Sequence, residues 1–175
     1  MDRQNQERAR RARNAVTHAQ QQADQLAMRA EQERALREQA RVRQNAEQLS
    51  AATNKALESL EATGFPGATM VGCKERVTKG FFSTRTEIKV VTEPGWSLHT
   101  SSSGYPSTGL HTVKYYLLAC GDYYVEESNT NDARSGNWWK EGRATPDEIA
   151  SRPQADVDAI MQRLNEYSHL PPNRP

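Results

Sequence analysis

The residue types that most often carry out chemistry in proteins are sparse and scattered in this chain. The donors of a zinc site or of a Cys–His nucleophilic pair are supplied by Cys73, His99, His111 and Cys120. Their spacings match no compact zinc signature, and the adjacent carboxylates Glu126 and Glu127 point to opposite faces of a strand. We therefore rank a small enzyme or metal-binding protein last among the function classes and expect no cofactor.

Aromatic side chains indicate a binding surface more strongly. All 12 Phe, Trp and Tyr residues lie after residue 63, and several form adjacent pairs. In a strand, one ring of such a pair faces the core and its neighbour faces outward. Outward-facing rings suit a protein partner, whereas the same residues also serve as ordinary core side chains. The candidates for a partner-binding patch are Trp96, Tyr105, Tyr116, Tyr124, Trp138 and Trp139.

One basic cluster suggests a second function class, a nucleic-acid-binding accessory protein. Its possible phosphate contacts are Arg8, Arg10, Arg11 and Arg13. Glu7 lies within the cluster, and no aromatic residue is present there for base stacking. A solvated charged helix face explains these residues better than phosphate contacts do, so nucleic acid ranks behind a protein partner.

The element that carries these arginines is a long helix. Residues 1–63 contain no glycine, no proline and no aromatic residue, and they are rich in Ala, Gln, Arg, Glu and Leu. A continuous helix of this length extends roughly 90 Å. Because a small body cannot bury all of it, we expect a coiled-coil-like arm over residues 1–63, although a single solvated helix is the alternative.

Two apolar seams run along this helix with the three- and four-residue spacing of heptads. The first seam consists of Ala9, Ala12, Val16, Ala19, Ala23, Leu26 and Ala30, and the second of Val42, Ala46, Leu49, Thr53, Ala56 and Leu60. Glu33 and Arg37 interrupt the register between them. Alanine buries little area, so we expect stable pairing, with a second copy or with a helical partner protein, only from about Val42 onward. The expected oligomerisation residues are Val42, Leu49, Ala56, Leu57 and Leu60.

After the helix, the sequence predicts a small domain over residues 64–170 and an extended tail over 171–175. Gly64 to Gly67 ends the helix, and strands are expected at 68–77, 81–92, 111–120 and 123–127. We expect a turn at 93–95 and a loop at 101–109. Thr145 to Glu148 forms a capping box, and a second helix follows from about residue 151 to 167. The fold class is therefore α+β, a long helix followed by an antiparallel meander with one or two C-terminal helices.

Composition excludes several further classes. The 175 residues carry a formal net charge of +1, with 23 Lys/Arg and 22 Asp/Glu, so neither a strongly basic nor an acidic protein is indicated. No apolar run is long enough for a membrane span or a signal peptide, and two cysteines fit a reducing compartment. We expect a cytoplasmic, non-enzymatic assembly or interaction protein that uses its helical arm and an aromatic-rich head.

Overall fold

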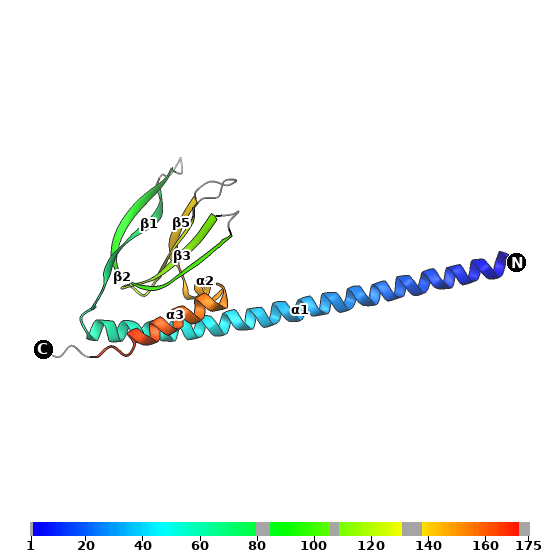
Figure 1. Cartoon of the computed structure of the whole chain (residues 1–175), viewed down its shortest axis with the longest axis horizontal. Coiled ribbons are helices and arrows are strands. Elements are labelled where there is room, and N and C mark those ends of the chain that lie inside the picture. Colours follow the sequence, from blue (N-terminus) through cyan, green and yellow to red (C-terminus); the bar gives the residue numbers. More distant parts are fainter. Residues whose placement is uncertain (1, 80–84, 106–108, 131–137, 172–175) are drawn as a thin grey trace. The chain divides into compact units, whose positions relative to one another are not determined.

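The computed structural model describes residues 2–79, 85–105, 109–130 and 138–171; within these ranges it describes every side chain except those of residues 2–5, 7–12, 14, 15, 75–79, 85–87, 105, 109, 138 and 139. The chain is an α+β protein, which confirms the predicted fold class. A long N-terminal helix precedes a five-stranded antiparallel sheet and two short helices (Figure 1). Within the described ranges, no helix is long and apolar enough to cross a membrane.

The long helix α1 spans Asp2–Ala62 and ends as its sequence predicts. Gly64 has a φ of 76°, in the left-handed region that glycine adopts without steric penalty. Phe65 follows with a φ of 55°, and its backbone N–H donates to the carbonyl oxygen of Leu60 at 2.7 Å. This bond satisfies one of the carbonyls that a helix end leaves without a partner.

The chain forms two compact units that divide within this helix. The first, Met1–Arg41, is the arm, and the second, Val42–Pro175, is the body. The domain boundary expected from the sequence lies at residue 63, because the change in amino-acid composition there marks the end of the helix. Compactness depends instead on which side chains are buried, and the last part of α1 is buried in the body. The body therefore includes part of the helix that the sequence assigns entirely to the arm.

The sheet is a meander in which each strand pairs with the next. Its strands are β1 (Thr69–Lys79), β2 (Arg85–Tyr105), β3 (Gly109–Leu118), β4 (Tyr123–Thr130) and β5 (Trp138–Ala144). Their order in the sheet follows the chain, β1-β2-β3-β4-β5, with antiparallel pairing throughout. The expected strands at 68–77, 111–120 and 123–127 correspond to β1, β3 and β4. The described part of the expected strand 81–92 lies in β2.

Strand β2 corrects two expectations, because residues 93–95 are not a turn and 101–105 are not a loop. Its first half pairs with β1 and its second half with β3, with the change at Gly95. The carbonyl of Pro94 accepts from the Ala119 N–H at 3.0 Å, on the β3 side. In an antiparallel strand, the backbone nitrogen and carbonyl oxygen of one residue point to the same neighbouring strand. The Pro94 nitrogen therefore also points toward β3 and away from β1, just before the pairing of β2 with β3 begins at Gly95. The proline therefore disrupts no pairing with β1.

The first C-terminal helix begins where the sequence predicts, whereas the second begins at Gln154, three residues after the expected start near 151, because Ser151 caps the end of the first. Helix α2 spans Pro146–Ala150, and its capping box is complete: Thr145 Oγ1 accepts from the Glu148 N–H at 3.3 Å, and the Glu148 carboxylate accepts from the Thr145 N–H at 2.7 Å. Helix α3 spans Gln154–Tyr167 and buries Val157, Ile160 and Leu164 in the core, with Met161 partly buried against the same cluster.

The main core lies between one face of the sheet and the helices of the body (Figure 1). Alternate residues of β3, Val113, Tyr115 and Leu117, face these helices. Leu118 lies on the other face, in a smaller buried cluster. Strand β3 is therefore covered on both faces. The core cluster consists of Ala46, Leu49, Ala52, Ala56, Leu60, Trp96, Leu98, Val113, Tyr115, Leu117, Tyr123, Val125, Ile149, Ala150, Val157, Ile160 and Leu164.

Candidate functional site

The second seam of α1 is covered by the protein's own body. Leu49, Ala56 and Leu60 are 0% exposed in the main core, and Val42 and Leu57 are partly buried against the same cluster. These five residues are the ones expected to hold an oligomer together. The core packing of Leu49, Ala56 and Leu60 leaves these three no exposed apolar surface for a second chain, whereas a role for the partly buried Val42 and Leu57 stays a prediction. Both seams have heptad spacing, so the sequence of the helix alone does not show which of them the body covers.

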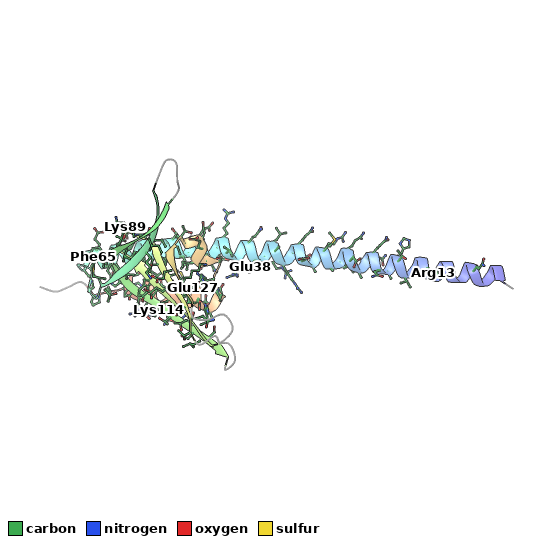
Figure 2. The ribbon with its side chains drawn as sticks, turned by 90° about the horizontal axis from the view of Figure 1, so that it is seen from above. Arg13, Glu38, Phe65, Lys89, Lys114 and Glu127 are labelled. Atoms are coloured by element: carbon green, nitrogen blue, oxygen red, sulfur yellow. The ribbon has the colours of Figure 1, made fainter. Side chains whose placement is uncertain are left out.

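The described side chains of the first seam, from Val16 to Ala30, are in contrast exposed on the arm, and those of Ala9 and Ala12 lie outside the described residues. Val16 and Leu26 are 64% and 65% exposed, and the seam alanines from Ala19 to Ala30 are exposed as well. Figure 2 shows side chains projecting from more than one side of this helix. The interrupting residues Glu33 and Arg37 form an ion pair at 3.5 Å on the arm's surface. The predicted break in register therefore falls at the end of the arm, and the two seams belong to different units.

The basic cluster lies in the first turns of the arm. The side chain of Arg13 is described and exposed (Figure 2). The side chains of Arg8, Arg10 and Arg11 lie outside the described residues. Phosphate binding by this cluster therefore stays a prediction.

Two of the candidate partner-binding aromatics are core residues. Trp96 is 2% exposed, its Nε1–H donates to the carbonyl oxygen of Pro66 at 3.0 Å, and its ring stacks on Phe65 with centroids 5.4 Å apart. Tyr124 is completely buried, and Tyr116 is half-buried. The side chains of Tyr105, Trp138 and Trp139 lie outside the described residues. Trp96 and Tyr124 are therefore removed from the predicted patch, because the core of a small body requires their large rings.

Tyr124 belongs to a polar clasp that joins the two edge strands β1 and β5. Its hydroxyl accepts from the Lys74 backbone N–H at 2.8 Å and donates to Glu141 Oε2 at 2.9 Å. The Lys74 ammonium lies 2.6 Å from Glu141 Oε1. Burial raises the pKa of Glu141, but the hydrogen bonds from Lys74 and Tyr124 outweigh it, and the net pKa is lowered. The clasp satisfies an N–H on an edge strand that pairs on one side only.

The cysteines and histidines do not converge. Cys73 is buried in the smaller cluster on one face of the sheet, whereas His99 stacks on Tyr115 on the helix-covered face. Cys120 is exposed after β3, where its sulfur accepts from Arg143 at 3.4 Å. His111 lies on β3 opposite Asn129. Within the part of the chain that the structure describes, no group of three or more His, Cys, Asp or Glu residues is arranged to hold a metal ion.

A buried polar network that the sequence did not reveal surrounds Asp156, in the first turn of α3. Its Oδ2 accepts from the Tyr115 hydroxyl at 2.7 Å and from the Ser101 hydroxyl at 3.3 Å. His99 Nε2 lies 3.5 Å from Oδ1. Burial, and then the hydrogen bond to Asp156, raises the pKa of Tyr115, so its hydroxyl remains a donor.

This network holds α3 on the sheet. Serine, histidine and aspartate are the residue types of a hydrolytic triad, in which the serine contacts the imidazole. Here the Ser101 hydroxyl contacts the carboxylate of Asp156 instead. The only sign of Asp156 in the sequence is an acidic residue in a helix's first turn, which usually indicates nothing beyond the helix start.

A cavity of about 470 Å³ lies beside β5 and α2. Its lining includes Gly142 and the guanidinium groups of Arg143 and Arg152. Arg152 forms an ion pair with Glu127, and Arg143 lies 3.2 Å from Asp122. These ion pairs connect the neighbouring elements, so both arginines of the lining already have acidic partners within the chain.

Comparisons of the chain with protein-family models, with curated proteins and with solved structures find no match.

Proposed function

We propose that this protein is a non-enzymatic interaction protein whose arm binds another helix through the first seam. The observation that carries the proposal is the contrast between the two seams of α1. The second seam is buried by the body at Leu49, Ala56 and Leu60, whereas the first leaves Val16 and Leu26 largely exposed. Both have heptad spacing, but among the described side chains it is those of the second seam that are buried in the core.

The physical reason is the free energy still available on the arm. Burying an exposed leucine or valine side chain is worth about 1.5–3 kcal/mol. A single helix in water gains none of this, and packing of an apolar face supplies most helical stability in proteins. The alanines of the seam allow a second helix to approach closely, since helix separation depends on side-chain size at the contact. The arm therefore suits a helix as its partner.

The body contributes less than the arm to the binding that we propose. With Trp96 and Tyr124 in the core, Tyr116 is the one of the six candidate aromatics whose side chain is described and partly exposed, and its hydroxyl lies 3.5 Å from Glu126. Tyr105, Trp138 and Trp139 remain candidates from the sequence. We assign the main interaction to the arm.

The test compares two substitutions at similarly exposed positions of the arm. Leu26 lies on the first seam and is 65% exposed, whereas Met28 lies off it and is 60% exposed. The full-length chain is examined by sedimentation for self-association. Its binding to two synthetic helices, both with leucine and alanine in their own heptad seam, is measured by fluorescence anisotropy. One helix has Glu and the other Lys at the flanking positions.

We expect at least one of these three associations, and we expect Leu26→Gln to weaken it about tenfold or more, while Met28→Gln leaves it unchanged. The reason is that only Leu26 loses buried apolar area when the seam is covered. A chain that stays monomeric and binds neither helix at about 100 µM would refute the proposal. Equal effects of the two substitutions would also count against it.

A further inference from the structure

The charged residues beside the first seam are all of one sign. In the heptad that places Ala9, Val16, Ala23 and Ala30 at position a, the flanking e and g positions hold Arg8, Arg13, Arg29 and Arg34, and no Asp or Glu. The side chains of Arg13, Arg29 and Arg34 are described, and all three are exposed. The first seam is therefore bordered by positive charge on both sides.

The acidic residues of the arm lie elsewhere on the helix. Asp24, Glu31 and Glu38 follow one another at intervals of seven residues, at position b on the outer side. Glu38 is hydrogen-bonded to Arg41, which lowers the pKa of its carboxyl. Glu33, which interrupts the apolar register after Ala30, forms an ion pair with Arg37. Acidic residues are thus segregated from the e and g flanks, where the charged residues are all arginines, although Arg3, Arg10 and Arg11 lie at positions b and c.

This segregation disfavours a second copy of the chain as the partner. In a parallel pair in register, a g residue meets the e residue five positions later on the other helix, so Arg29 meets Arg34 and Arg8 meets Arg13. In an antiparallel pair, e meets e and g meets g, and these positions offer no acidic partner for any of the arginines. Two copies therefore gain no attractive ion pair across their flanks, and the parallel arrangement places like charges together.

We propose, resting on the proposed function above, that the arm's partner is a helix with acidic residues beside its own apolar seam. Such a helix places a carboxylate opposite Arg13, Arg29 and Arg34 while its apolar side chains cover Val16 and Leu26. Flanking charges of this kind determine partner choice and orientation in paired helices. The spacing of the arginines beside a continuous apolar seam favours a helix over phosphate, because phosphate contacts do not require Leu26 or Val16.

The test uses the two synthetic helices and two triple substitutions in the full-length chain. The flank variant carries Arg13→Glu, Arg29→Glu and Arg34→Glu. The matched control carries Arg3→Glu, Arg10→Glu and Arg11→Glu, which change the net charge equally at positions b and c, away from the flanks. Arg and Glu have similar helix propensity, so neither variant weakens the helix by its composition.

We expect the natural chain to bind the Glu-flanked helix about tenfold more tightly than the Lys-flanked helix, with the difference diminishing at high salt. Three exposed ion pairs of ordinary strength together account for a factor of this size. The flank variant should reverse the preference, and the control should keep it. The flank variant's thermal unfolding should match that of the natural chain, which shows that the body is intact.

Each other outcome has a definite meaning. Equal binding of both helices, or self-association of the natural chain tighter than its binding to the Glu-flanked helix, would overturn the acidic partner while leaving helix binding in place. Tighter binding of a duplex oligonucleotide than of either helix, reduced equally by both triple substitutions, would assign the arginines to phosphates and overturn it as well. Absence of self-association and of both helix complexes would instead refute the proposed function.

Discussion

Replacing one leucine on each seam of α1 tests the division of this helix into two parts. Leu49 is 0% exposed and packs in the core with the sheet and α3, whereas Leu26 is 65% exposed on the arm. We expect Leu49→Ala to destabilise the body and Leu26→Ala to leave it unchanged. The two substitutions remove the same atoms from the same helix, so the difference measures burial alone.

The expected magnitude follows from the environment of each side chain. Leu→Ala in a packed core costs about 2–5 kcal/mol, because it removes buried apolar area and leaves a cavity. Leu49 lies in a core cluster with residues of β2, β3, β4, α2 and α3, so we expect about 3 kcal/mol, or a fall of about 10 °C in Tm for a unit of this size. At Leu26, solvent already surrounds the side chain, and the change should lie within about 0.5 kcal/mol.

The assay is urea or thermal unfolding followed by tryptophan fluorescence. Trp96 is buried in the same core cluster as Leu49, so its emission reports the body. Far-ultraviolet circular dichroism is less suitable, since the arm adds helical signal that does not depend on the core. Equal destabilisation by both substitutions, or a change below about 0.5 kcal/mol for Leu49→Ala, would contradict the assignment of the second seam to the body.

Three further substitutions test particular contacts of the body. Asp156→Asn should lower the free energy of unfolding by about 1–3 kcal/mol in denaturant titration, because it replaces the carboxylate that accepts from Tyr115, and an unchanged stability would refute the role of this network. Gly95→Ala should destabilise by a similar amount, since its Cβ would lie 3.0 Å from the carbonyl oxygen of Leu117, and urea unfolding measures this. The pKa of Glu141 is lower in the folded than in the unfolded protein, so its contribution to stability is complete above its ordinary unfolded pKa and is lost as pH falls through the folded value. Glu141→Gln should therefore weaken the dependence of the free energy of unfolding on pH in this acidic range. If denaturant unfolding at several pH values shows the same loss of stability on acidification in both proteins, the result would argue against the clasp.

Local sequence signals predicted the elements that depend on local interactions. The capping box at Thr145 and the left-handed glycine at Gly64 occur as expected, because each satisfies backbone groups a few residues away. Strand β2 shows the limit of such signals. Its proline and glycine at residues 94 and 95 resemble a turn, yet they lie where one pairing partner replaces the other, and strand pairing is not a local property.

The candidate sites were less predictable for the same reason. Trp96 and Tyr124 have the residue types of a binding patch, and only their burial identifies them as core. Asp156 becomes conspicuous only when Tyr115, Ser101 and α3 meet, since these groups are far apart in the sequence. Long-range packing determines both outcomes.

The sequence by itself determined that a helix free of glycine and proline precedes a turn-rich body, and that two heptad seams with different registers follow one another along it. Helix propensity and periodicity are local, so they can be read without coordinates. Only the tertiary structure decided which seam the body covers. Alanine and leucine at heptad spacing pack equally well against a sheet or another helix, and the second seam lies against the protein's own sheet and α3. The described part of the first seam, from Val16 to Ala30, is exposed on the arm, as are Arg13, Arg29 and Arg34 beside it.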